Sequence, residues 1–270
     1  MIETIFSLFA FGFGACVGSF LNVVADRLPT GQSLVTPRSH CQGCGRPIHT
    51  RDLVPVLSYL WLRGRCRHCS VRISPRLIAV EILTGALFAA LYLKHGWGAP
   101  VVITSAGVAL LVAVAVIDIE HRLIPNHIVI PAVIVLLVLA ATWPELGFER
   151  ALFFEHVHIS SLANSLAAGA GAFILFLAVK AVYPAGMGAG DVKMAGMLGL
   201  LLGYPGIVVA LWTAVVLGGV LAVGLLVLGG RSRKDAMPFG PFLSAGGLLA
   251  LLAGKEILDL YFATADRLLG

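Results

Sequence analysis

The stretch APVVITSAGVALLVAVAVID, residues 99–118, contains one charged residue, Asp118, at its very end. A helix of about twenty residues rises about 30 Å, which matches the hydrocarbon core of a bilayer. The stretch therefore predicts a transmembrane helix whose last turn carries a carboxylate.

Comparable apolar runs recur along most of the chain. Of its 270 residues, 59% are hydrophobic and 12% are charged, whereas a soluble domain is nearer half apolar and a quarter charged. Backbone groups in lipid must be satisfied within the protein, and the runs have the length of helices, so we expect helices and not a β-barrel. We predict an all-α polytopic membrane protein with about eight transmembrane helices, near residues 2–24, 77–94, 99–118, 124–143, 159–183, 190–203, 205–229 and 240–262.

Two of these runs have features that need a separate explanation. The run at 190–203 would rise only about 21 Å as a helix, so a re-entrant segment is an alternative to a crossing helix. Without a crossing there, the basic loop at 230–238 would move outside, so we expect a short crossing helix. The glycine-rich GFGACVG at 12–18 has no strand before it and predicts close helix packing, not a phosphate loop.

Charged residues collect in the loops between the apolar runs. The only long polar region, 26–76, carries nine of the 19 Lys and Arg residues, and the positive-inside rule places it in the cytoplasm and the N-terminus outside. The mostly acidic loop 144–158 then falls outside, and the basic loop 230–238 falls inside. Topology thus explains the net charge of +5, and we expect no nucleic-acid partner. The nine residues are Arg27, Arg38, Arg46, Arg51, Arg63, Arg65, Arg67, Arg72 and Arg76.

Four of the five cysteines form two CxxC pairs in this polar loop. Cys41 and Cys44 form CQGC, and Cys66 and Cys69 form CRHC, with 21 residues between the pairs. Four thiolates can complete the tetrahedral shell of a structural zinc ion, which would supply folding free energy to a loop too short for a large core. Disulfides or free thiols are the alternative, but persistent disulfides are uncommon in a reducing cytoplasm.

Charge within apolar runs is costly. Glu3, Glu256, Asp259 and Asp266 lie near chain or segment ends and can reach water, which leaves three acidic residues to explain. Asp118 ends its run and Asp191 begins the run at 190–203, so both lie just inside the cytoplasmic side. Carboxylates at one depth on separate helices can converge and share a proton, as in aspartic proteases. Taken singly, Asp118 could be an interfacial cap and Asp191 an N-cap. Glu81 could act in function, reach the interface or pair with Arg76.

The stretch GAGDVK, residues 188–193, matches the GxGDxK form of the GxGD-type membrane aspartic proteases. Over nearly its whole length the chain resembles one branch of these, the type IV prepilin peptidases. The other stretches that carry the resemblance are GSFLNVVADRLP (18–29), the two CxxC pairs with SYLWLRGRC (58–66), VEILTGALF (80–88), IDIEHRLIPN (117–126) and MPFGPFLSAGG (237–247).

The resemblance implies a multi-pass peptidase of the bacterial inner membrane. Such enzymes cut the basic leader from prepilins and from pseudopilins of type II secretion at the cytoplasmic face, with the N-terminus of this chain then periplasmic. Asp118 and Asp191 match the catalytic pair. Many members also methylate the new N-terminal residue with S-adenosylmethionine, and the cysteine loop is typical of these members. We expect supporting roles for Gly188, Gly190, Lys193 and Glu81.

Two other functions stay open at this point. One is a leader peptidase without methylation, and the other is a transporter or channel in which the two aspartates bind protons or cations. For the domains we expect a first transmembrane helix (1–25), a cytoplasmic zinc-binding loop (26–76) and a transmembrane peptidase domain (77–270). The expected partners are prepilins, pseudopilins and the lipid bilayer, and the sequence indicates no oligomeric state.

Overall fold

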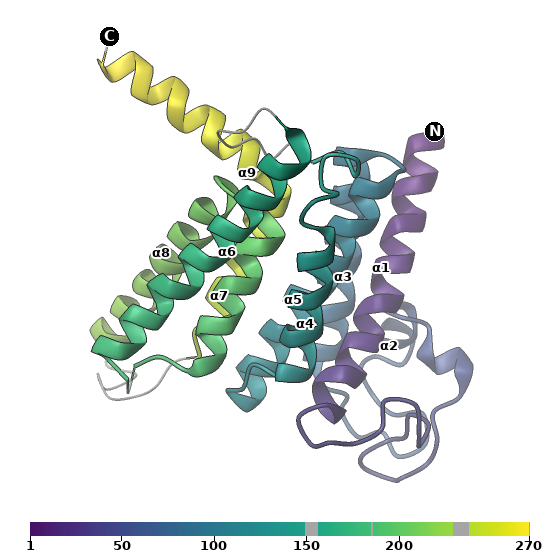
Figure 1. Ribbon diagram of the computed structural model, residues 1–270. Coiled ribbons are helices and arrows are strands. Elements are labelled where there is room, and N and C mark those ends of the chain that lie inside the picture. The colour runs from purple at the N-terminus through teal and green to yellow at the C-terminus, as the bar shows by residue number, and fades with distance from the viewer. Residues whose placement is uncertain (149–155, 185, 229–237, 270) are drawn as a thin grey trace. The chain divides into compact units, whose positions relative to one another are not determined.

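The computed structural model describes residues 1–148, 156–184, 186–228 and 238–269. Within these ranges the chain forms helices and two isolated β-bridges, without a β-strand (Figure 1). The prediction of an all-α membrane protein is thereby confirmed. The elements are α1 (Ile2–Arg27), the 3₁₀ turn η1 (Thr50–Leu53), α2 (Leu57–Trp61), α3 (Pro75–His95), α4 (Ala99–His121), α5 (Asn126–Leu139), α6 (Val157–Val182), α7 (Ala189–Leu202), α8 (Gly206–Val227) and α9 (Gly240–Leu269).

Each of the eight predicted apolar runs forms a helix, but the helices are not equally long. Among the described residues, six are long and apolar enough to cross a membrane: α1, α3, α4, α6, α8 and α9. The other two, α5 and α7, have 14 residues each, which rise only about 21 Å. The predicted number of about eight spans is therefore approximate, with six full-length spans and two short helices.

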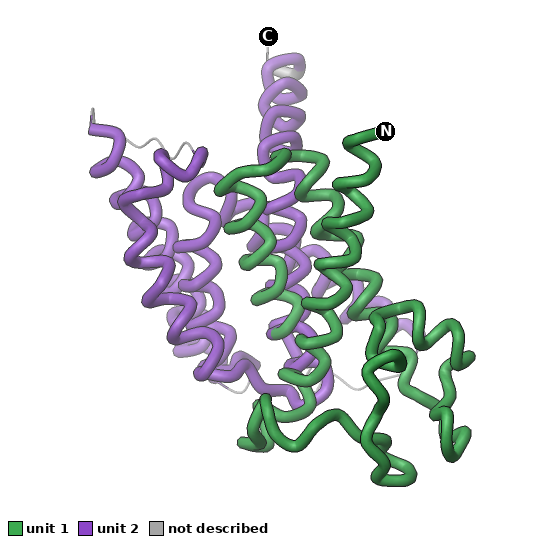
Figure 2. Tube along the Cα trace, turned by 90° about the vertical axis from the view of Figure 1, so that its right-hand side faces the viewer, with its two compact units in different colours: residues 1–113 green, residues 114–270 purple. Residues whose placement is uncertain are grey.

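The chain divides into two compact units, residues 1–113 and 114–270 (Figure 2). The cysteine-containing loop belongs to the first unit, together with α1 and α3, and α4 continues from the first unit into the second. The division into domains at residues 25 and 76 stays a prediction. Of the predicted loops 144–158 and 230–238, residues 149–155 and 230–237 lie outside the described residues.

In the first unit, α1 packs against α3 through small residues. A Cβ at Gly18 would lie 2.9 Å from the Cα of Glu81, and a Cβ at Gly14 would lie 2.8 Å from the Thr84 carbonyl oxygen. Gly85 approaches the Phe11 carbonyl oxygen in the same way, at 2.9 Å. Contacts this close between backbones require glycine. The predicted packing role of the glycine-rich stretch is thereby confirmed for two of its glycines.

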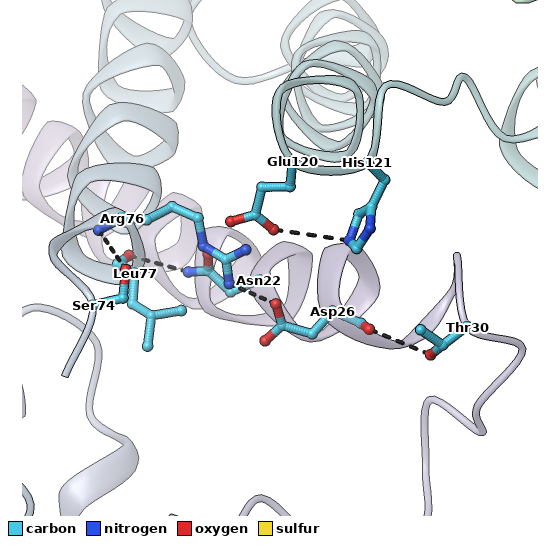
Figure 3. A network of polar contacts seen from close by, with 8 residues as sticks. All are labelled: Asn22, Asp26, Thr30, Ser74, Arg76, Leu77, Glu120 and His121. Atoms are coloured by element: carbon cyan, nitrogen blue, oxygen red, sulfur yellow. Dashed lines mark hydrogen bonds and ion pairs between the residues drawn. The ribbon is translucent and has the colours of Figure 1, made fainter. Parts of the chain in front are cut away.

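Polar contacts join the end of α1 to the start of α3. The Asn22 side-chain amide donates to the Leu77 carbonyl oxygen at 3.0 Å, and the Arg76 guanidinium donates to the Asp26 carboxylate at 2.7 Å (Figure 3). Asn22 is 4% exposed, so its hydrogen bond satisfies a polar group that would be costly to bury alone. These contacts fix the two points at which the polar loop leaves and re-enters the helix pair.

The second unit is built around α7. Ten of its 14 residues are buried, and α5, α6, α8 and α9 all contact it. Figure 1 shows α7 alongside α6. A helix too short to cross a bilayer by itself is tolerated where surrounding protein covers it. This burial explains how a 14-residue segment that begins with an aspartate is accommodated.

Candidate active site and metal centre

The four cysteine sulfurs of the loop lie within 4.8 Å of one another, and the sulfurs of Cys41 and Cys69 are 3.7 Å apart. All four thiols are free. Tetrahedral coordination with a metal–sulfur distance of about 2.3 Å separates the sulfurs by about 3.8 Å. The cluster therefore could hold a metal ion with little rearrangement. It contains only these cysteines among the described residues.

The two CxxC turns share one backbone pattern. In each, the N–H of the first cysteine donates to the carbonyl oxygen five residues later, at 2.9 Å, and the residue after the second cysteine has a positive φ. That residue is Gly45 (φ 69°) in the first turn and Ser70 (φ 57°) in the second. Isolated antiparallel bridges close the turns, His40 to Pro47 and Arg65 to Arg72. The repeat CQGCGRPI (41–48) and CRHCSVRI (66–73) is the sequence signal for this pattern.

Backbone N–H groups in the second turn favour the thiolate form. The N–H groups of Cys69 and His68 bond the sulfur of Cys66 and lower the pKa of this thiol to about 6. A metal ligand must be deprotonated, so this local field suits metal binding. His68 itself lies against Arg46, with 3.4 Å between Nδ1 and Nη1. It is outside the sulfur cluster.

Glu81 is buried in α3 and holds the backbone of the loop. Its Oε2 accepts a hydrogen bond from the N–H of Val56 at 2.7 Å. Val56 immediately precedes α2 and has a φ of 63°, a costly conformation for a β-branched residue. Glu81 is therefore one of the contacts that keep this backbone in place. Its predicted supporting role in catalysis stays a prediction.

Asp118 lies in the last turn of α4 and contacts the start of α9. Its Oδ2 accepts a hydrogen bond from the N–H of Gly240 at 3.0 Å, and the residue is 4% exposed. A Cβ at position 240 would lie 2.6 Å from Oδ2, so this approach requires glycine. Sequence reasoning did not assign Gly240 a role, although the stretch MPFGPFLSAGG drew attention to it.

Asp191 lies in the first turn of α7 and is 8% exposed. Its Oδ2 accepts a hydrogen bond from the N–H of Gly188 at 3.0 Å, and Gly188 is the N-cap residue of the helix. A carboxylate in this position is favourable beside the partial positive charge of a helix N-terminus. The N-cap itself is therefore Gly188 and not Asp191, which caps the helix from its third position.

The two aspartates and Ile124 gather at one end of the second unit. Asp191 directly follows Gly190, and Asp118 is bonded to Gly240. A Cβ at Gly190 would lie 2.7 Å from the Cβ of Ile124, and a Cβ at Gly240 would lie 3.2 Å from the Cδ1 of Ile124. Ile124 thus separates the two helix starts, and glycines on both sides let them approach it.

Lys193 turns away from Asp191 and joins α7 to α5. Its ammonium group donates to the Asn126 side-chain oxygen at 2.9 Å, and Asn126 is the first residue of α5. The pair is exposed, so it contributes little stability by itself, but it links the start of the buried helix to its neighbour. In the sequence, only the position of Lys193 two residues after Asp191 indicates that its side chain points elsewhere.

Known families match both parts of the chain. The family described as "Bacterial Peptidase A24 N-terminal domain" matches residues 13–95, and the "Type IV leader peptidase family" matches residues 105–223. The first match contains the four cysteines and Glu81, and the second contains both aspartates. No solved structure matches the chain significantly.

Curated relatives match the chain over most of its length. Three of them are named "Prepilin leader peptidase/N-methyltransferase". The relative from Bacillus subtilis is 34% identical, over 94% of this chain and 97% of its own length. The relative from Aeromonas salmonicida is 33% identical, over 96% and 94%, and that from Pseudomonas putida is 32% identical, over 95% and 92%.

Proposed function

The chain belongs to the type IV leader peptidase family, and from this premise we propose that it cuts the basic leader from prepilins and pseudopilins. Asp118 and Asp191 are the proposed catalytic pair. The observation that carries the proposal is their geometry: two buried carboxylates from different helices, beside glycines that both approach Ile124.

The proposed reaction is hydrolysis by an aspartyl dyad. One carboxylate takes a proton from water, which attacks the scissile carbonyl, while the other, protonated, donates its proton to the carbonyl oxygen or the leaving amine. In each aspartate a backbone N–H bonds Oδ2. The Oδ1 atoms are the proposed positions for the attacking water and the scissile carbonyl.

Both carboxylates lie at helix ends, which suits a substrate that is partly in the membrane. Asp118 is in the last turn of α4 and Asp191 in the first turn of α7. A prepilin can keep its apolar helix in the bilayer and its basic leader among anionic headgroups, so its scissile bond lies near the interface. The proposed site is therefore at the cytoplasmic side of the bacterial inner membrane, with the N-terminus periplasmic.

The same chain is proposed to methylate the new N-terminal residue, with S-adenosylmethionine as the donor. The support is the paired activity in the names of the relatives, which match this chain over both of its units. When bound, the donor would supply an electrophilic methyl group to the free amine that cleavage exposes. The residues that bind the donor are not identified.

The metal proposed for the cysteine cluster is zinc, in a structural role. Four sulfur ligands suit zinc, and a complete shell of four protein ligands leaves no open position for substrate or water. Cys41, Cys44, Cys66 and Cys69 would hold the ion, and the bound metal would stabilise the fold of the loop.

The decisive experiment combines the full chain in bilayers with a prepilin and S-adenosylmethionine, and follows product mass. We expect loss of the leader and a gain of one methyl group. Asp118→Asn and Asp191→Asn should each lower the cleavage rate by about a thousandfold or more, because each removes a proton-transfer group.

Glu120→Gln is the matched control. Glu120 lies two residues from Asp118 but is exposed and faces His121, 4.0 Å away, so its variant should cleave at close to the unmodified rate. Cleavage at that rate by either aspartate variant would contradict the dyad. Leader loss without the gain of a methyl group would show a peptidase without methyltransferase activity.

A further inference from the structure

The short helix α2 presents three large apolar side chains outward from the cysteine-containing loop. Leu57 is 65% exposed, Leu60 is 61% exposed and Trp61 is 83% exposed. Their spacing of three and four residues places them on one side of a helical turn. An exposed patch of this kind on a polar loop indicates a contact surface.

Tyr59 of α2 turns inward instead. The Tyr59 hydroxyl donates to the Ile73 carbonyl oxygen at 3.4 Å, and its ring covers Gly64, where a Cβ would lie 2.9 Å from the ring. Gly64 directly precedes the second CxxC turn. The helix is therefore anchored to the cysteine cluster through its one aromatic hydroxyl, and this anchoring directs the leucines and the tryptophan away from the loop.

The hydrogen bond between Glu81 and Val56 fixes the depth of α2. The 21 residues of α3 rise about 31 Å, which is just the thickness of the hydrocarbon core, so the whole helix is needed to cross. Glu81 lies six residues after the first residue of α3, which is about 9 Å along the helix axis. Val56 is bonded to Glu81, so the start of α2 lies within about 9 Å of the level at which α3 enters the hydrocarbon core, on the lipid side of that boundary.

The positive charge of the residues that follow α2 also suits a position at the membrane surface. Arg63 and Arg65 follow α2 directly and are exposed, at the end of the helix pair where the loop gathers (Figure 2). Arginine beside an exposed tryptophan is typical of segments that lie at a membrane surface, with the ring among headgroups and the cation beside lipid phosphates.

We propose that α2 is an interfacial membrane anchor, in which Leu57, Leu60 and Trp61 insert into the lipid surface beside α3. The anchor would hold the cysteine loop against the bilayer. The occupant of this surface is lipid, because the Glu81 contact places the helix at membrane depth. This inference does not depend on the proposed peptidase activity.

The first test measures contact of Trp61 with lipid. The full chain and its Trp61→Phe variant are placed in vesicles of phosphatidylcholine and phosphatidylglycerol, and the difference in their emission reports Trp61. We expect blue-shifted emission that loses more than about half its intensity when the acyl chains are brominated near the headgroup. Trp212→Phe gives the positive control, because Trp212 is 70% exposed on the spanning helix α8.

Two results would overturn the proposal. Emission that acrylamide in the water quenches and brominated lipid does not would place Trp61 in solvent. Blue-shifted emission that neither reagent quenches would place it against protein, including another part of this chain.

A second test perturbs the anchor and follows amide exchange. Leu60→Asp should speed hydrogen exchange across residues 53–62 by about tenfold in vesicles, because a charge opposes insertion. Val35→Asp is the matched control, since Val35 is 83% exposed on the same loop but outside α2, and exchange across 53–62 should stay unchanged. Equal exchange in the Leu60→Asp variant and the unmodified chain would contradict the proposal.

Discussion

The cysteine cluster and the aspartate pair differ in how their parts are distributed along the chain. Cys41 and Cys69 are separated by 28 positions, whereas Asp118 and Gly240, which bonds its carboxylate, are separated by 122. The cluster is assembled by two local turns, and the aspartate pair is assembled by the packing of α4, α7 and α9. A local site depends on its own ligands, and a distributed site depends on the helices around it.

Metal removal should have the largest effect and should separate the two regions. Structural zinc supplies on the order of 10 kcal/mol to small domains, so a chelator should sharply increase hydrogen exchange in residues 41–73. Residues 190–202 should keep their protection, because α7 is held by helix contacts in the other unit. Exchange measured by mass spectrometry checks both segments at once.

Cysteine variants provide the control for metal removal. Cys66→Ser should reduce the bound zinc and mimic the chelator, whereas Cys16→Ser should change neither metal content nor exchange, since Cys16 lies in α1, outside the cluster. A chain that contains no zinc when isolated would overturn the assignment of the metal. Loss of protection in both segments would show that the regions do not behave separately.

A single methyl group at the start of α9 tests the distributed site. The Cβ of Gly240→Ala would lie 2.6 Å from the Asp118 Oδ2, so α9 or the carboxylate must move. We expect the cleavage rate to fall roughly 10- to 100-fold, with zinc content unchanged. Gly219→Ala in α8 is the control, because nothing lies within 4 Å of a Cβ there. An unchanged cleavage rate would show that the close contact of Gly240 with Asp118 is not needed for cleavage.

A reciprocal pair of substitutions tests the equivalence of the two CxxC turns. Gly45→Ser should weaken metal binding by about 1 kcal/mol, or roughly fivefold, because a side chain disfavours a φ of 69°. Ser70→Gly should strengthen binding by a similar factor. Competition with a chromogenic chelator measures both. Effects of the same sign in the two variants would show that the turns are not equivalent.

The smallest expected effect concerns an ion pair beside the cluster. Arg67 donates two hydrogen bonds to Asp52, at 2.6 and 2.9 Å. These hydrogen bonds are the main cause of the lowered pKa of the Asp52 carboxyl. The pair therefore stabilises the loop above the unfolded pKa of Asp52, about 4, and this stabilisation is lost as the pH falls through the lowered folded pKa.

The expected difference between the Asp52→Asn variant and the unmodified chain follows that dependence. Loop stability, measured by hydrogen exchange at several pH values, should be lower in the variant near neutral pH. The difference should shrink below about pH 4. A difference that does not change with pH would show that the ion pair is not its cause.

The sequence predicts the helices well because lipid leaves few alternatives. Each apolar run became a helix, with bounds that differ by a few residues, since termini depend on caps such as Ser74 before α3. Hydropathy does not indicate how much protein surrounds a segment. It could therefore not show that the short helix α7 is buried by its neighbours. It also gave no sign of the backbone break at Ala253 within α9, where φ is −136°.

How well each site could be predicted depends on whether its residues are close together in the sequence. The cysteine cluster could be predicted because CxxC spacing alone brings the sulfurs together. The aspartates could be named from their positions, but the contacts of Gly240 with Asp118 and of Asn126 with Lys193 depend on tertiary packing. Neither pair is linked by any periodicity or motif spacing, so only the folded chain reveals it.

The glycines between α6 and α7 have a mechanical consequence. A Cβ on Gly199 would lie 2.6 Å from the Cα of Gly169, and a Cβ on Gly169 would lie 3.2 Å from the Gly196 carbonyl oxygen. The two helices thus touch backbone to backbone at these positions, where little space is left for sliding. We expect them to move as one stiff body that carries Asp191. Entry of a peptide would then be governed by displacement of α5 or of the start of α9, and not by bending of α7.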